Sequence, residues 1–126
     1  SEVTILIVED NDVNQVMAGA MLNKFGFYYE IAANGLEAFQ MASSSQYSMI
    51  LMDCHMPIMD GFEATRKIRS IPFYENIPIV GLTANVFSEN KEACLKAGMN
   101  DVMCKPFKSK ELKKLIVKFL SNIAAA

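Results

Sequence analysis

The sequence predicts an α/β fold in which a parallel five-stranded sheet is covered by helices on both faces. Five short apolar runs, each bounded by turn residues, alternate with about five segments whose apolar residues recur at helical spacing. Parallel strands need a crossover segment between them, and that crossover is right-handed. Each helical segment is apolar on one side only, which places the helices in outer layers. The fold class is therefore a doubly wound, three-layer α/β sandwich.

The composition indicates one globular domain of 126 residues, because 52% of them are hydrophobic and 21% are charged. A net charge of −2 excludes an overall basic, nucleic-acid-binding character. We find no apolar run of membrane-span length and expect no signal peptide. Cys54, Cys94 and Cys104 lack the spacing of a zinc site or a disulfide framework. We therefore expect reduced thiols, a cytoplasmic location and no membrane contact by this domain.

The first strand and helix come from the N-terminal segment. The apolar run Thr4–Glu9 predicts a buried strand that leads directly into Asp10. Helical spacing then relates five apolar residues: Val13, Val16, Met17, Ala20 and Met21. Gly26 follows as a C-terminal glycine. We expect this apolar stripe to face the core and to leave Asn14 and Ala18 outside it.

The middle of the chain predicts a second strand, a helix and a third strand. Tyr28–Ala32 is a short apolar and aromatic run. Asn34 and Glu37 have the spacing of a capping box, which begins a helix that includes Ala42. Met49–Asp53 is too short for a helix and is apolar throughout until its final acid. That pattern predicts a strand buried on both faces.

A shaped loop follows the third strand. Pro57 restricts Met56 to extended geometry. Asp60 is then the predicted N-cap of a helix over Gly61–Ser70, with Glu63 at its third position.

The last part of the chain repeats the alternation. Ile71–Asn76 contains a proline and is predicted to be a loop, and Ile77–Thr83 is the fourth strand. A helix over Ser88–Ala97 and a brief strand over Asp101–Cys104 follow. The final helix has the strongest amphipathic stripe: Leu112, Leu115, Ile116, Phe119 and Leu120.

Four predicted strands end in groups that suit phosphoryl chemistry: Glu9–Asp10, Asp53, Thr83 and Lys105. The carboxyl ends of parallel strands share one edge of a sheet, so we expect these groups to converge. Three carboxylates repel one another unless a cation joins them, and Mg²⁺ prefers such oxygen ligands. Lys105 adds a mobile charge for a phosphoryl oxygen, and an aspartate can act as the nucleophile.

Five motifs occur in a fixed order: Val8-Glu9-Asp10-Asn11, Met52–Gly61, Leu82-Thr83-Ala84-Asn85, Ala97-Gly98-Met99 and Lys105-Pro106-Phe107. In this order and spacing they resemble the receiver domains of two-component response regulators. The resemblance covers nearly all of the chain. It implies a flavodoxin-like (βα)5 fold with the strand order 2-1-3-4-5.

The resemblance implies an acceptor and a metal site. Asp53 would take a phosphoryl group from a phosphohistidine. Mg²⁺ would be bound by the side chains of Asp10 and Asp53, by the backbone carbonyl of Cys54, and by Glu9 through a water molecule. Such a domain catalyses its own phosphorylation and dephosphorylation and is not a conventional enzyme. Its partners would be a sensor histidine kinase, a histidine phosphotransfer domain or both, without direct contact to nucleic acid.

Other residues would assist the acceptor. Thr83 would bond the phosphoryl group and move with it, and Lys105 would pair with its oxygens. The peptide bond before Pro106 would be cis, as in the family. His55 would lie at the rim and modulate water access, and Asn85 would support the site.

The amino-acid sequences of three segments resemble those of receivers fused to hybrid sensor histidine kinases: Glu9–Gln15, Met52–Pro57 and Glu63–Arg69. The start at Ser1 fits a domain excised from a longer chain. One position departs from the family, which usually has an aromatic residue three positions before the lysine. Val102 stands there and has no ring to move, so we do not expect the usual threonine–aromatic switch.

A phosphotransfer partner has to approach Asp53, and the nearest helical surface is that of the first helix. The expected exposure of Ala18 predicts that Ala18→Arg blocks this partner. Two alternatives remain: a pseudo-receiver that only binds proteins, and a small metal-dependent phosphatase. The intact acids with Thr83 and Lys105 argue against the first, and the lack of a P-loop or Gly-rich turn argues against related small α/β enzymes.

Overall fold

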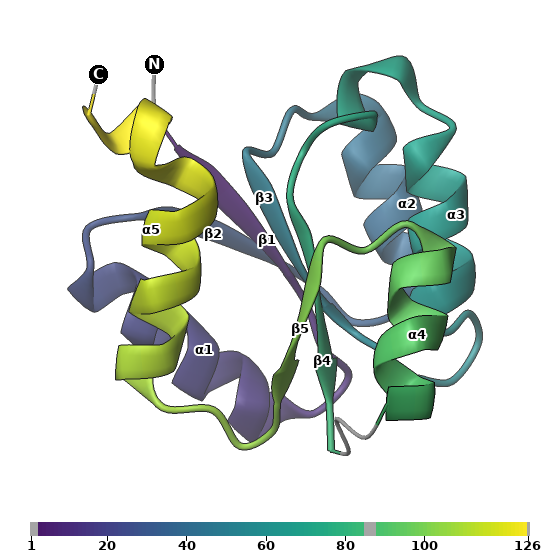
Figure 1. Cartoon of the computed structure of the whole chain (residues 1–126), viewed down its shortest axis with the longest axis horizontal. Coiled ribbons are helices and arrows are strands. Elements are labelled where there is room, and N and C mark those ends of the chain that lie inside the picture. The colour runs from purple at the N-terminus through teal and green to yellow at the C-terminus, as the bar shows by residue number, and fades with distance from the viewer. Residues whose placement is uncertain (1–2, 85–87, 126) are drawn as a thin grey trace.

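The computed structural model describes residues 3–84 and 88–125 of the chain (Figure 1). Within these residues, five strands alternate with five α-helices and one short 3-10 helix. In chain order they are β1 (Thr4–Val8), α1 (Asp12–Lys24), β2 (Tyr28–Ala32), α2 (Gly35–Ser44), β3 (Met49–Asp53), α3 (Gly61–Arg69), η1 (Pro72–Tyr74), β4 (Ile79–Thr83), α4 (Ser88–Ala97), β5 (Asp101–Cys104) and α5 (Ser109–Ala125).

All strand pairs in the sheet are parallel, and the strand order is β2-β1-β3-β4-β5. The predicted fold class and the order 2-1-3-4-5 are therefore confirmed. The chain moves outward from β1 to β2 and then returns across β1 to form β3. Doubly wound sheets bind ligands at the carboxyl ends of the strands where this direction reverses. In this protein that point lies between β1 and β3.

The helices cover the sheet in two layers, with α1 and α5 on one face and α2, α3 and α4 on the other (Figure 1). Neighbouring strand residues point to opposite faces, so each strand contributes to two cores. The core beneath α1 and α5 includes Ile5, Ile7, Met49, Leu51, Val80, Leu82, Leu22, Leu112, Ile116 and Leu120. The core beneath α2, α3 and α4 includes Leu6, Val8, Ile50, Met52, Ile79, Ala38, Ala42, Ala64, Ile68 and Cys94.

The predicted inner face of α1 is wrong for Val13, Val16, Met17 and Ala20, which are exposed, whereas Met21 packs against the core. Val13 and Val16 are 65% and 72% exposed, whereas Ala18 is only 3% exposed and packs in the core with Leu22. The physical reason is close packing against β2: a Cβ atom on Gly19 would lie 2.6 Å from the ring of Tyr29. Ala18, Gly19 and Leu22 therefore form the buried face, while Val13, Val16 and Met17 face outward.

Most other predicted boundaries are confirmed, with small shifts. β2, β3 and β5 have their predicted bounds. β4 begins at Ile79 rather than Ile77, because Pro78 has no N–H for the sheet, although its carbonyl accepts from the Ile50 N–H at 2.9 Å. The predicted loop after α3 contains the 3-10 helix η1. Asn34 and Asp60 are confirmed as N-caps that accept from the third helical N–H at 2.9 Å.

Arg69, the last residue of α3, connects that helix to the segments that precede β4 and β5. Its guanidinium donates to the carbonyl oxygens of Ile77 (2.6 Å) and Gly98 (2.9 Å). It also donates to the side-chain oxygen of Asn100 at 2.8 Å, and the same oxygen accepts from the Ile79 N–H. Arg69 thereby helps to align the starts of two strands whose ends carry site residues.

Among the residues that the structure describes, no helix combines the length and the apolar composition needed to cross a membrane.

Candidate functional site

The carboxyl edge of the sheet brings together side chains that are far apart in the sequence. Glu9 follows β1 directly, and Asp53 is the last residue of β3. The pairing of Val8 with Met52 places these two strand ends side by side. Thr83 ends β4, the next strand across, and Lys105 follows β5. The predicted convergence of the four strand ends is present.

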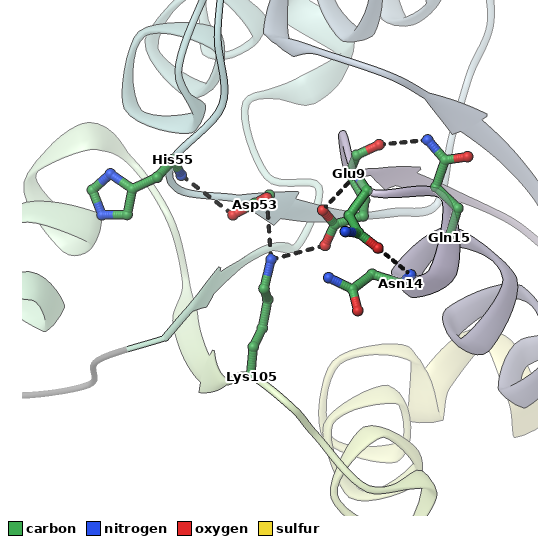
Figure 2. A network of polar contacts seen from close by, with 7 residues as sticks. Glu9, Asn14, Gln15, Asp53, His55 and Lys105 are labelled. Atoms are coloured by element: carbon green, nitrogen blue, oxygen red, sulfur yellow. Dashed lines mark hydrogen bonds and ion pairs between the residues drawn. The ribbon is translucent and has the colours of Figure 1, made fainter.

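The side chain of Lys105 bridges two buried carboxylates, as Figure 2 shows. Its Nζ lies 2.9 Å from Oε1 of Glu9 and 3.2 Å from Oδ2 of Asp53. Glu9 is 2% exposed and Asp53 is 3% exposed. Buried carboxylates require charged or hydrogen-bonding partners, and Lys105 serves both of them.

A third carboxylate completes an oxygen-rich cluster. Glu9, Asp10 and Asp53 each offer one carboxylate oxygen, and these atoms lie within 4.8 Å of one another. Asp10 is exposed, in contrast to the other two. Mg²⁺ is commonly held by one or two carboxylates together with water and phosphate oxygens. The donor set therefore fits a hard divalent cation that remains open to a ligand from solvent.

The electrostatics of the cluster favour an added cation. Burial and, secondly, the negative charge of Glu9 raise the pKa of Asp53 from 3.8 to about 6. Lys105 and the backbone N–H of His55 act in the opposite direction but do not cancel these effects. Burial tends to lower the pKa of Lys105, yet its hydrogen bond to Glu9 and the charges of Asp53 and Glu9 outweigh this and raise it. The site thus holds excess negative charge that Lys105 alone does not balance.

The loop after β3 is shaped by a glycine. The N–H of Gly61 donates to the carbonyl of Cys54 at 3.1 Å, and the Cys54 N–H donates to Leu82 at 2.9 Å. A Cβ atom on Gly61 would lie 2.1 Å from the carbonyl oxygen of Asp53, so a larger residue could not occupy this position without moving the acid. The Cys54 carbonyl has a second lone pair that the hydrogen bond from Gly61 does not use.

Thr83, Pro106 and His55 are the remaining predicted site residues in the described part of the chain. Thr83 is buried at the end of β4, and the Lys105–Pro106 peptide bond is cis, as predicted. The ring of His55 packs edge-on against Phe62 at 5.8 Å, and its backbone N–H, rather than its imidazole, donates to Asp53 Oδ1 at 3.3 Å. Asn85 lies outside the described residues.

Sequence reasoning gave no role to two residues that bond to the Glu9–Asp10 turn. The Gln15 side-chain amide donates to the Glu9 carbonyl at 2.7 Å, and the Asn11 N–H donates to Glu9 Oε2 at 3.1 Å. Both belong to the segment Glu9–Gln15 that resembles hybrid-kinase receivers. The segment Glu9–Gln15 could be recognised in the sequence. Which atoms of Gln15 and Asn11 bond to Glu9 depends on the backbone conformation at the start of α1, which the sequence does not show.

Comparison with solved structures gives the same architecture. The receiver domain of sensor histidine kinase PA1611 from Pseudomonas aeruginosa PAO1, solved with a magnesium ion in its active site cleft, has a TM-score of 0.90 and 42% identity. The match covers 96% of this chain and 99% of that one. The Saccharomyces cerevisiae Ssk1 receiver domain, solved with the histidine phosphotransfer protein Ypd1, has a TM-score of 0.87 and 32% identity, with 94% and 88% covered.

Comparison with known sequences points to the same family. Hybrid signal transduction histidine kinase B of Dictyostelium discoideum is 40% identical over 119 residues, which cover 86% of this chain but only 6% of that protein. The chain thus spans a small part of this much longer relative. A family model described as the response regulator receiver domain matches residues 5–117. On this evidence, the chain belongs to the response regulator receiver domains of two-component systems.

Proposed function

We propose that residues 1–126 work as one receiver domain that accepts a phosphoryl group on Asp53 and passes the signal on in a two-component phosphorelay. The observation that best supports the acceptor is the position of Asp53, which lies at the carboxyl edge between an acidic pair and Lys105. This arrangement combines a nucleophile with charges of both signs. Phosphoryl transfer depends largely on such positioning and charge stabilisation.

In the proposed transfer, a carboxylate oxygen of Asp53 attacks the phosphorus of a phosphohistidine. The phosphorus–nitrogen bond breaks, and the imidazole keeps the bonding electron pair. Lys105 Nζ lies 3.2 Å from Oδ2 of Asp53 and can pair with an oxygen of the incoming group. The Thr83 hydroxyl would donate to another of these oxygens. The attack requires the charged form of Asp53, although its buried site raises its pKa to about 6.

Asp10 and Asp53 would hold Mg²⁺ by their side chains, Cys54 by its backbone carbonyl, and Glu9 through water. When bound, Mg²⁺ would supply positive charge to the oxygens of the phosphoryl group. The three carboxylates within 4.8 Å of one another support this assignment. So does the magnesium ion in the cleft of the similar PA1611 receiver domain.

The phosphohistidine donor would be a sensor histidine kinase or a histidine phosphotransfer domain. The Ssk1 receiver domain, which is 32% identical, has been solved with such a phosphotransfer protein. Next to the site, α1 presents an exposed apolar patch made of Val13, Val16 and Met17. We propose that this α1 patch, rather than the buried Ala18, contacts the partner. The parent protein would be a hybrid histidine kinase, with this domain in the cytoplasm and without nucleic acid contact of its own.

The acceptor is tested with a small phosphodonor such as acetyl phosphate and Mg²⁺, followed by intact-mass spectrometry. The wild type should gain one phosphoryl group, and Asp53→Asn should gain none. An unlabelled wild type would favour the pseudo-receiver alternative. A labelled mutant would place the acceptor on another residue.

The partner surface is tested by phosphotransfer from a histidine phosphotransfer domain. Val16→Arg should slow this transfer strongly while acetyl phosphate still labels Asp53. Val117→Arg on α5, which is also an exposed valine, is the matched control and should transfer normally. Normal transfer by the Val16→Arg protein would exclude the α1 patch as the docking surface.

A further inference from the structure

The carboxylate of Asp10 is placed by its backbone rather than by contacts of its own. Asp10 is exposed, and within the described residues its carboxylate has no hydrogen bond or ion pair. Glu9 and Asp53, by contrast, are buried and both bonded to Lys105. The membership of Asp10 in the 4.8 Å cluster therefore depends on the conformation of the main chain on either side of it.

Gln15 is bonded to the main chain on both sides of Asp10. Its side-chain amide donates to the carbonyl of Glu9 at 2.7 Å, as Figure 2 shows. Its backbone N–H donates to the carbonyl of Asn11 at 3.0 Å. Gln15, one turn into α1, thus bonds to the carbonyl of the residue before Asp10 and to the carbonyl of the residue after it.

The side-chain bond has a direct geometric consequence for Asp10. The Glu9 carbonyl and the Asp10 N–H belong to one planar peptide unit. Fixing that oxygen sets the orientation of the unit and limits the direction in which the Asp10 side chain leaves the backbone. The Asn11 N–H, which donates to Glu9 Oε2 at 3.1 Å, holds the following peptide unit.

The fold itself has little need of the Gln15 amide. The N-terminus of α1 is already capped by Asn11, whose side-chain oxygen accepts from the Asn14 N–H at 3.0 Å. The Gln15 side chain is half-buried on the inner side of α1, where a methionine of similar length would also fit. The distinctive property of glutamine at this position is its donor to the Glu9 carbonyl.

We propose that Gln15 is a positioning residue that holds Asp10 in the geometry required to bind Mg²⁺. This inference rests on the proposed function, because it requires Mg²⁺ at the carboxylate cluster. Residues that orient metal ligands typically change metal affinity by 10- to 100-fold when they are removed.

The test is a Mg²⁺ titration of the Gln15→Met protein, in which the NMR shifts of the amides around Asp53 report the binding. We expect about tenfold weaker Mg²⁺ binding than in the wild type. Thermal unfolding in EDTA should change little, since the helix cap and the core remain. Gln40→Met, at an exposed position of α2, is the matched control and should bind Mg²⁺ like the wild type. Gln15→Asn, whose amide is one methylene too short, should behave like Gln15→Met.

A dissociation constant for both Gln15 variants within twofold of the wild type would overturn the inference. A double-mutant cycle adds a second criterion: in an Asp10→Asn background, Gln15→Met should cause no further loss of affinity. A full additional tenfold loss would show that Gln15 acts through another group. A wild type that binds no Mg²⁺ would instead refute the proposed metal site, so the two failures are distinguishable.

Discussion

Asp53→Asn should stabilise the metal-free protein at neutral and alkaline pH. The folded protein raises the pKa of Asp53 from 3.8 to about 6, so the charged form is disfavoured relative to the unfolded chain. One pKa unit corresponds to about 1.4 kcal/mol, so the charge costs roughly 3 kcal/mol of folding free energy at pH 8. Asparagine has a similar shape without the charge. We therefore expect the free energy of unfolding to increase by about 1 to 3 kcal/mol.

The stabilisation by Asp53→Asn should increase with pH. Because the folded-state pKa is raised, the contribution of the protonated carboxyl is fully present below pH 3.8 and is lost as the pH rises through about 6. At pH 4 the same two pKa values give a cost of well under about 1 kcal/mol. The advantage of Asp53→Asn should therefore shrink from pH 8 to pH 4.

Urea unfolding followed by circular dichroism in EDTA measures the difference at both pH values. Added Mg²⁺ provides the control, because a ligand that binds only the folded state stabilises it in proportion to the logarithm of its concentration. The wild type should gain more from Mg²⁺ than the mutant. A metal-free Asp53→Asn protein that is less stable than the wild type at pH 8 would refute the electrostatic reasoning.

Three further outcomes are expected. Asp10→Asn should weaken Mg²⁺ binding yet unfold at an equal or higher temperature in EDTA, because it relieves repulsion within the cluster; clearly earlier unfolding would contradict this. Arg69→Met should lower the free energy of unfolding in urea by about 2 to 4 kcal/mol, because several acceptors lose a charged donor. Arg66→Met, at an exposed position, should change it by less than about 0.5 kcal/mol. On phosphorylation, amide NMR shifts near Val102 should change less than those near Thr83, and a dominant change at Val102 would indicate an output switch without an aromatic ring.

The sequence by itself determined the strands, the order of the elements and the candidate site acids Glu9, Asp10 and Asp53. Met49–Asp53 is apolar up to its final acid, and the structure buries all five residues, because a central parallel strand is covered on both faces. Asp60 was recognisable as an N-cap because the third helical N–H needs an acceptor in any helix. These features depend on neighbouring residues or on a short continuous apolar run, both of which are visible along the chain.

Only the tertiary structure decided which side of α1 faces the core and what holds the carboxylate cluster together. Helical spacing identified an apolar stripe through Val13 and Val16, but periodicity does not tell whether a stripe meets the sheet or a partner. The close approach of Gly19 to Tyr29 settled that choice. Lys105 reaches Glu9 across a sequence separation of 96 residues, a contact that exists only because β1, β3, β4 and β5 are packed side by side. Such contacts depend on where separate elements meet in space, and that information is absent from any local pattern of residues.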